Sequence, residues 1–341
     1  MNITRRDLLG ALPAVALLPR ALTAQTGAPL RVRGLHSMTL AVTDVNRSLE
    51  FYQGLFGMPL QARHGDTRLL RVGPGPKFMA LAPAGAGGAA GVSRFGIAIE
   101  DFNVDRILAV LAEHGVTRAA GSSPAAAGPL KVFASSRDGT PEIFVSDPSG
   151  VVFQLQDSTY CGGSGPLGST CGTVQPSPAK GLIAVRDFSH FTVASASADE
   201  SNKFYQALFG FGIQAYQGPT APVLGVGPGV HFLMFTGGGA ARGRGGAPPR
   251  PPRVDHPCFG IDNFNPDTVV KLLEGYGIKP RGANPSTPLV WYISQRMENR
   301  GGAPGTGTPE LYFTDPDNIA IQIQDVKYCG GGGFLGDACP G

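Results

Sequence analysis

The sequence is poor in charge. Lys, Arg, Asp and Glu make up 16% of its 341 residues, and the formal net charge is only +3. No Lys- and Arg-rich run lies beside aromatic residues, so nothing in the chain indicates the basic surface with which proteins bind nucleic acid. Hydrophobic residues reach 42%, which supports buried cores and excludes disorder by composition. The length is enough for two domains of ordinary size.

The chain also lacks an apolar run long enough to span a membrane comfortably. The apolar run at residues 10–18 is short and follows Arg5 and Arg6. Paired arginines before such a run resemble a twin-arginine export signal, and an ordinary secretory signal is the alternative. We expect residues 1–28 to be this signal, cleaved near Ala24. The mature protein is then expected to be periplasmic or secreted, without stable membrane insertion.

Cysteines are few, and their number is odd. Cys161 and Cys171 have the same spacing as Cys329 and Cys339, and both pairs lie in Gly-rich segments. In an oxidising compartment this pattern predicts two local disulfides. A metal site made of either pair alone would lack ligands. Cys258 is left over in a strand-like run, and we expect it to be a small buried apolar residue.

An internal repeat dominates what the sequence does contain. LHSMTLAVTDVNRSLEFYQGLFGM (35–58) corresponds to FSHFTVASASADESNKFYQALFGF (189–212). Each reads as an alternating strand followed by a helix. Asp44 is a predicted N-cap, and Gly57 and Gly210 suit the position after a helix that needs a positive φ.

Further strands and a second helix follow in each copy, and a hairpin closes it. Each copy therefore reads β-α-β-β-β with another helix between the later strands. The predicted fold class is α+β, with two tandem βαβββ modules that pair into open, cup-like mixed β-sheets with helices outside. The predicted divisions are an N-terminal module (29–161), a Gly/Pro/Ser-rich tail and linker (162–180), a C-terminal module (181–329) and a Cys/Gly-rich tail (330–341).

The closing hairpins differ at one position that matters for chemistry. In PELYFTDPDNIAIQIQDVKYC (309–329), strand alternation around the Asp-Pro-Asp-Asn turn brings Tyr312 and Gln322 to one side. The earlier copy, PEIFVSDPSGVVFQLQDSTYC (141–161), has Phe144 and Gln154 there.

These motifs together resemble the vicinal oxygen chelate superfamily, which includes glyoxalase I, bleomycin-resistance proteins and type I extradiol dioxygenases. The resemblance lies in the order His/Ser-x-T-L/V, Phe-Tyr, Gly, His-x-x-Phe and Asp-Pro-Asp. It implies that paired βαβββ modules form a cup, in which residues of the first, a later and the last strand bind a divalent metal.

Mapped onto this chain, the resemblance gives His190, His256 and Gln322 as the ligand positions of the C-terminal module. Gln322 stands where the family most often has Glu. Two neutral imidazoles and an oxygen suit Fe(II), which we favour, or Mn(II) or Zn(II). The N-terminal module has Ser37, Arg94 and Gln154 at these positions and is expected to be metal-free, since arginine stays charged and repels a cation. His36, next to Ser37, should face the opposite side unless a bulge shifts it.

The resemblance to extradiol dioxygenases implies two further roles. His231 would act as acid/base and Tyr312 would hydrogen-bond a substrate oxygen. We therefore expect a metal-dependent, extradiol-dioxygenase-like oxidoreductase acting on a small oxygen-rich molecule such as an aromatic diol. The alternatives are a glyoxalase-like lyase or epimerase, and a non-catalytic protein that binds a small molecule. The sequence leaves a homo-oligomer open.

Overall fold

The structure is a computed structural model that describes residues 27–121, 128–217, 221–237, 251–284, 287–296, 305 and 307–339. The predicted signal, residues 1–28, lies almost wholly outside these residues. In the part of the chain described, no helix combines the length and apolar character needed to cross a membrane.

The strands of the N-terminal module pair in the order β2–β3–β4–β1–β5–β9–β8–β7–β6. The pairs β1–β4, β5–β9 and β6–β7 are parallel and the others antiparallel, so the sheet is mixed, as predicted. The bounds are β1 Val32–Val42, β2 Leu60–His64, β3 Thr67–Arg71, β4 Phe78–Pro83, β5 Gly91–Ile99, β6 Thr117–Arg118, β7 Lys131–Arg137, β8 Thr140–Ser146 and β9 Val152–Asp157.

The C-terminal module repeats this order as β11–β12–β13–β10–β14–β18–β17–β16–β15. The bounds are β10 Val185–Ala194, β11 Ile213–Tyr216, β12 Pro222–Gly225, β13 Phe232–Thr236, β14 Arg253–Ile261, β15 Lys279–Pro280, β16 Val290–Gln295, β17 Pro309–Thr314 and β18 Ala320–Asp325. The two sheets join where β5 pairs with β14 at Val92 and Val254. The two copies of the sequence repeat therefore have the same strand order.

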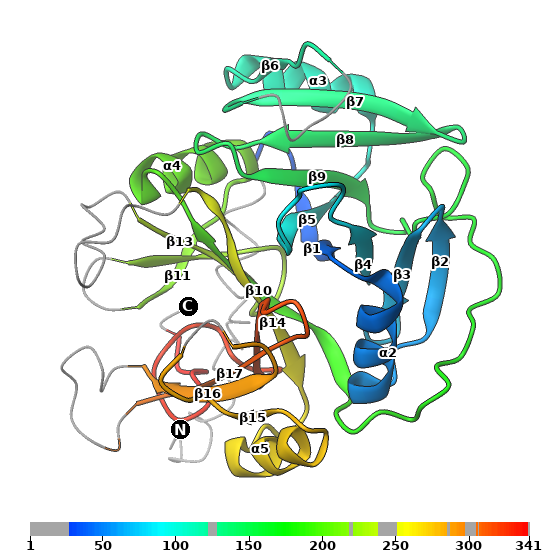
Figure 1. The fold of residues 1–341 in the computed structure, drawn as a ribbon. Helices are drawn as coiled ribbons and strands as arrows, with labels where there is room; N and C mark the ends of the chain where they lie inside the picture. The colour runs from blue at the N-terminus through cyan, green and yellow to red at the C-terminus, as the bar shows by residue number, and fades with distance from the viewer. Residues whose placement is uncertain are drawn as a thin grey trace, which may run out of the picture.

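In the described residues, four helices accompany these strands: α2 Val45–Phe56, α3 Val104–Glu113, α4 Ala198–Phe209 and α5 Pro266–Gly275. Asp44 caps α2 by accepting from the backbone N–H groups of Asn46 and Arg47. Gly57 and Gly210 follow α2 and α4 with φ of 66° and 65°, as predicted. Figure 1 shows α3 beside β7 at one end of the molecule and α5 near β15 and β16 at the other.

The first helix of each module packs on strands of the other module. From α2, the Tyr52 hydroxyl donates to Asp315 across 3.0 Å, and the Phe56 ring lies 5.5 Å from that of Phe259. From α4, the Tyr205 ring lies 5.4 Å from that of Phe153. Apart from Asp315, these side chains all belong to one continuous buried hydrophobic cluster. The two modules therefore share a hydrophobic core.

The cysteine predictions are confirmed. Disulfides join Cys161 to Cys171 and Cys329 to Cys339. Cys258 is free and fully buried on β14. Each disulfide closes a Gly-rich tail directly after the last strand of its module.

Candidate metal centre

Three neighbouring strands of the C-terminal module bring the predicted ligands together. His190 lies on β10, His256 on β14 and Gln322 on β18, and β14 pairs with both of the other strands. The Nε2 atoms of His190 and His256 each lie 3.1 Å from Gln322 Oε1. The three residues are buried, with His256 the most exposed at 8%.

The geometry of this cluster fits a bound cation. A metal about 2.1 Å from each ligand holds adjacent ligand atoms about 3 Å apart, and the two N–O separations of 3.1 Å match this spacing. His256 Nδ1 lies 3.1 Å from Asp255 Oδ2, and the hydrogen bond from His256 lowers the pKa of that carboxyl. An ionised Asp255 fixes the imidazole proton on Nδ1, so Nε2 directs a lone pair at the oxygen of Gln322.

The surroundings of His190 keep it in the form that binds metals. Its ring stacks on Phe232 with 4.2 Å between centroids, and its Nδ1 lies 3.2 Å from Ser189 Oγ. Burial, followed by the nearby His256, lowers the pKa of His190 well below its usual value. The imidazole is therefore neutral at physiological pH and has a nitrogen lone pair available.

The donor set is unusual because it carries no negative charge. Among the described residues, no group of three or more His, Cys, Asp and Glu side chains is placed to hold a metal. Gln322 supplies an amide oxygen instead, and its buried Nε2 has no hydrogen-bond partner in the described part of the chain. Two imidazole nitrogens and one oxygen suit Fe(II), Mn(II) or Zn(II).

Tyr312 lies beside this cluster. It pairs with Gln322 across β17 and β18, and its ring meets that of His256 at 86°. Its hydroxyl donates to Glu310 Oε2 across 3.2 Å. Burial, followed by the charge of Glu310, raises the pKa of Tyr312 well above its usual value. Tyr312 therefore stays protonated at neutral pH. Its hydroxyl can donate a hydrogen bond but does not give up its proton.

Tyr292 and Arg281 stack in turn on Tyr312, on the side away from the ligands. The Tyr292 ring stacks on Tyr312 with 4.9 Å between centroids and 8° between planes. The guanidinium carbon of Arg281 lies 3.1 Å from the centre of the Tyr292 ring. A cation over an electron-rich ring is a favourable contact, so Arg281 helps to hold the stacked rings of Tyr292 and Tyr312 in place.

Sequence reasoning missed the network that holds Glu310. Its Oε1 forms an ion pair with Arg296 Nε at 2.9 Å and accepts a hydrogen bond from the Tyr328 hydroxyl across 2.8 Å. The N-terminal module repeats the network with Arg137, Glu142 and Tyr160. The signal was present in the repeated Pro-Glu and Tyr-Cys pairs of the two hairpins.

His231 lies elsewhere. Its Nε2 is 3.5 Å from Asp187 Oδ2, and Asp187 also forms an ion pair with Lys77 at 2.6 Å. His231, Asp187 and Ser189 line a cavity of about 350 Å³. The ring is thus directed at Asp187, and the structure does not bring it together with His190, His256 and Gln322 as it does Tyr312.

The N-terminal module has different chemistry at the same register. Ser37 donates to Gln156 Oε1 across 2.9 Å, and Arg94 lies over the Phe144 ring at 5.2 Å. The strand β1 has an irregularity between Leu35 and Ser37, which is the exception that we allowed for, so simple alternation does not apply to His36. His36 packs against Phe78 and Tyr160, the counterparts of two rings around His190.

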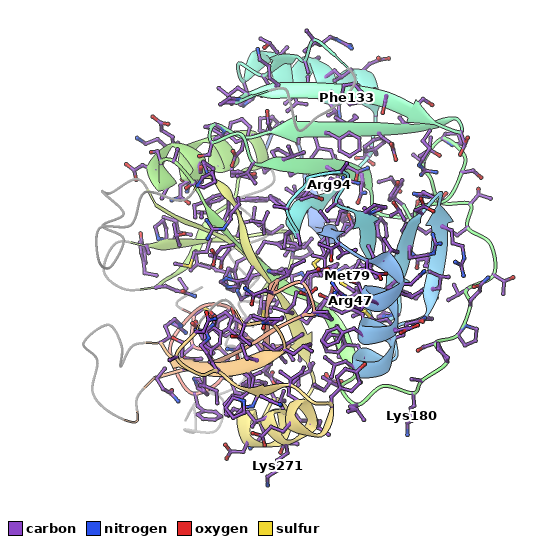
Figure 2. All side chains as sticks on the ribbon, viewed as in Figure 1. Arg47, Met79, Arg94, Phe133, Lys180 and Lys271 are labelled. Atoms are coloured by element: carbon purple, nitrogen blue, oxygen red, sulfur yellow. A yellow bond between two sulfur atoms is a disulfide. The ribbon has the colours of Figure 1, made fainter. Side chains whose placement is uncertain are left out.

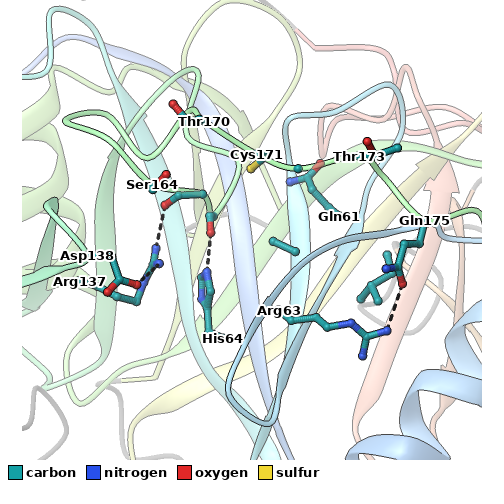
Figure 3. A pocket seen from close by; sticks show the side chains of 15 residues that line it. Gln61, Arg63, His64, Arg137, Asp138, Ser164, Thr170, Cys171, Thr173 and Gln175 are labelled. Atoms are coloured by element: carbon teal, nitrogen blue, oxygen red, sulfur yellow. Dashed lines mark hydrogen bonds and ion pairs between the residues drawn. The ribbon is translucent and has the colours of Figure 1, made fainter.

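A second cavity, of about 380 Å³, lies beside the first disulfide and contains none of the predicted ligands (Figure 3). Its basic side chains are already engaged. His64 bonds to the Gly162 carbonyl, Arg63 donates to Gln175 across 3.1 Å, and Arg137 pairs with Glu142. These bonds hold the Gly-rich tail against β2.

Comparison with known proteins agrees with this architecture. Residues 34–155 match the model of the Glyoxalase/Bleomycin resistance protein/Dioxygenase superfamily. This match falls within the N-terminal module. A comparison with curated proteins finds no match.

Solved structures of this fold include a dioxygenase and a glyoxalase. A mutant of homoprotocatechuate 2,3-dioxygenase from Brevibacterium fuscum is 17% identical with a TM-score of 0.56, covering 88% of this chain and 74% of the dioxygenase. The Mn(II)-bound glyoxalase from Novosphingobium aromaticivorans is 14% identical with a TM-score of 0.56, covering 86% of this chain and 82% of the glyoxalase. At these identities the likeness establishes the fold of both modules and leaves the reaction to the site.

Proposed function

We propose that the C-terminal module binds one divalent metal, Fe(II) in preference to Mn(II) or Zn(II), through His190 Nε2, His256 Nε2 and Gln322 Oε1. We propose further that the protein is an extradiol-dioxygenase-like oxidoreductase acting on a small aromatic diol. The observation that carries this proposal is the convergence of three neutral donor atoms beside a protonated tyrosine. The resemblance in fold to a homoprotocatechuate dioxygenase supports it.

The bound metal would supply Lewis-acid binding of two adjacent substrate oxygens. The chain's own residues would orient the substrate. Tyr312 would turn its one hydroxyl hydrogen from Glu310 Oε2, to which it donates in this structure, towards a substrate oxygen. The Tyr292–Tyr312 stack would give the site an aromatic side next to His256.

His231 is proposed in a supporting role only. Its Nε2 lies 3.5 Å from Asp187 Oδ2. An acid/base role for His231 in the reaction would require direct contact with the substrate. A variant with His231→Gln tests this, because a direct acid/base would cost about 10²- to 10⁴-fold in turnover.

Metal analysis of the purified protein tests the proposal. Wild type should hold about one metal per chain, and the His190→Ala/His256→Ala double variant should hold none. The matched control is Ser37→Ala/Arg94→Ala, which changes the same strand positions in the N-terminal module and should keep the metal. Equal metal content in wild type and the His double variant would disprove the site.

Oxygen consumption then identifies the reaction. Uptake of O₂ with catechols and the Fe(II)-loaded protein supports the dioxygenase. Turnover of small carbonyl substrates with Zn(II), Ni(II) or Co(II) and no O₂ uptake would instead identify a glyoxalase-like lyase or epimerase. A metal-loaded protein that binds small molecules without turnover would be a binding protein.

We also propose that the protein is exported by the twin-arginine route. The two disulfides support an oxidising compartment. Replacing both Arg5 and Arg6 with Lys should leave the protein in the cytoplasm as uncleaved precursor, whereas wild type is recovered outside it. Export of the variant at the wild-type level would point to an ordinary secretory signal.

A further inference from the structure

Arg94 occupies, in the N-terminal module, the strand position that His256 occupies in the C-terminal module. Arg94 on β5 pairs with Thr39 of β1, and His256 on β14 pairs with Thr192 of β10. The guanidinium carbon of Arg94 lies 5.2 Å from the centre of the Phe144 ring. The sheet therefore directs Arg94 to the inside of its cup, and Figure 2 labels it below the β8 and β9 strands.

The guanidinium of Arg94 has no anionic partner. In the described part of the chain it makes no hydrogen bond or ion pair, and its Nε is buried without an acceptor. Glu142 is the nearest acid to influence it, but the carboxylate of Glu142 already accepts from Arg137 Nε across 3.1 Å. Arginine keeps its charge in proteins. Arg94 as a whole is half-buried. A cation whose inner nitrogen is buried with its hydrogen bond unmade is costly, and an anion from outside would supply the missing acceptors.

Two phenyl rings lie beside Arg94. Phe144 and Phe133 stack with 6.4 Å between centroids and 29° between planes. They correspond to Tyr312 and Tyr292, which pair across the equivalent strands of the other module. Gln154 pairs with Phe144 across β8 and β9 and adds one amide. The N-terminal module thus places the guanidinium of Arg94 beside two stacked phenyl rings.

We propose that the N-terminal module is a ligand site for a small planar organic carboxylate. Its carboxylate would accept two hydrogen bonds from the Arg94 fork, the geometry in which arginine binds carboxylates most strongly. Its flat apolar body would pack on Phe144 and Phe133. The site needs no metal and is separate from the centre at His190, His256 and Gln322.

Calorimetry with benzoate tests this on the full-length mature protein. Wild type should bind about one benzoate per chain. The Arg94→Met variant should bind at least tenfold more weakly, and Arg94→Lys should lie between them because it keeps the charge and loses the fork. Arg118→Met removes the same charge from an exposed site of the same module and should bind as wild type does.

Two other probes define the ligand class. Benzamide has the shape of benzoate without its charge and should not bind. Inorganic phosphate has charge without the apolar body and should bind more weakly than benzoate. Phosphate binding as tight as that of benzoate would overturn the aromatic part of the proposal, and tight benzamide binding would overturn the role of the charge.

Thermal unfolding keeps the test valid for each variant. Without ligand, Arg94→Met should be at least as stable as wild type, since it removes a half-buried charge that has no ion-pair partner in the described residues. Benzoate should raise the melting temperature of wild type and Arg118→Met but not that of Arg94→Met. Equal benzoate affinity in wild type and Arg94→Met, or no binding by wild type at millimolar benzoate, would disprove the site. The His190→Ala/His256→Ala variant should still bind benzoate, which separates this outcome from failure of the metal centre.

Discussion

The phenol ring of Tyr312 meets the imidazole of His256 edge to face, with 5.1 Å between their centroids. In the N-terminal module Phe144 takes the same position on its strand, so a ring without the hydroxyl fits this fold. Tyr312→Phe should therefore keep the structure and the metal and lower turnover about 10²- to 10⁴-fold, because it removes only the hydrogen-bond donor. Steady-state kinetics on a catechol, with metal analysis beside it, measures both quantities.

Tyr292→Phe is the control for that change. It removes a hydroxyl from the neighbouring stacked ring, farther from the metal ligands, and should leave the turnover number near that of wild type. If Tyr312→Phe had the same turnover number as wild type, Tyr312 would be only a packing residue.

Gln322→Glu should strengthen metal binding. It replaces a neutral amide oxygen with a carboxylate in a cluster that has no negative charge. We expect the metal dissociation constant to fall at least tenfold, equivalent to about 1.4 kcal/mol. Competition with a chelator of known affinity measures the change.

Gln154→Glu provides the matched comparison in the other module. It places the same carboxylate at the same strand position, but beside Arg94 instead of two histidines. This variant should gain no metal. It should also lose benzoate binding, because the new carboxylate pairs with Arg94 internally. Metal affinity that rises equally in both variants would count against a site formed by His190 and His256.

The Arg296–Glu310 ion pair should be important for stability. The side chains are 1% and 9% exposed, and Arg296→Met leaves the Glu310 carboxylate buried without its cation. Breaking such a pair costs about 3–5 kcal/mol. Arg137→Met breaks the equivalent pair, whose side chains are 23% and 18% exposed, and solvent should reduce its cost to about 1 kcal/mol. Urea unfolding of both variants measures the difference, and equal losses would show that burial does not set the energy.

His36 should make the protein acid-sensitive. Burial, assisted by Lys77, lowers the pKa of His36 to about 4, although the Tyr160 carbonyl that bonds its Nε2 at 2.6 Å opposes the shift. The unfolded chain takes up this proton near pH 6.5 and the folded protein only near pH 4. The stability contribution is therefore complete above pH 6.5 and is lost as the pH falls towards 4, by about 3 kcal/mol in total.

His36→Gln isolates this contribution. Glutamine can still donate to the Tyr160 carbonyl but does not titrate. Three other histidines with lowered pKa values, His64, His190 and His231, remain in both proteins and cancel in the comparison. The wild type should lose more stability than the variant between pH 7 and pH 4, as measured by urea midpoints. Parallel curves would mean that His36 does not cause the sensitivity.

The sequence was sufficient to predict the fold class and to name three residues that the structure brings close together in the candidate metal centre. The repeat fixed two equivalent strand orders, and strand alternation with family spacing then placed His190, His256 and Gln322 on one side of adjacent strands. Helix caps were also predictable, because Asp44 and Gly57 act through local backbone geometry.

The sequence did not predict features that depend on a local strand irregularity or on contacts between residues far apart in the chain. The irregularity in β1 that redirects His36 has no clear sequence signal. The direction of His231 depends on Asp187 and Lys77, which come from different modules. Asp255, whose carboxylate sets the proton position of His256, was also missed, because a residue beside a ligand usually faces the other side of a strand.

The exchange of helices between the modules has a consequence for how the two halves can diverge. Tyr52 and Phe56 of α2 cover apolar strands that belong to the C-terminal module. The N-terminal half must therefore remain folded for the other half to have an interior, whatever lies in its own cup. Its ligand positions were consequently free to become Ser37, Arg94 and Gln154 without loss of the protein. A duplicated scaffold of this kind can keep one reaction centre and use the other cup for a different ligand.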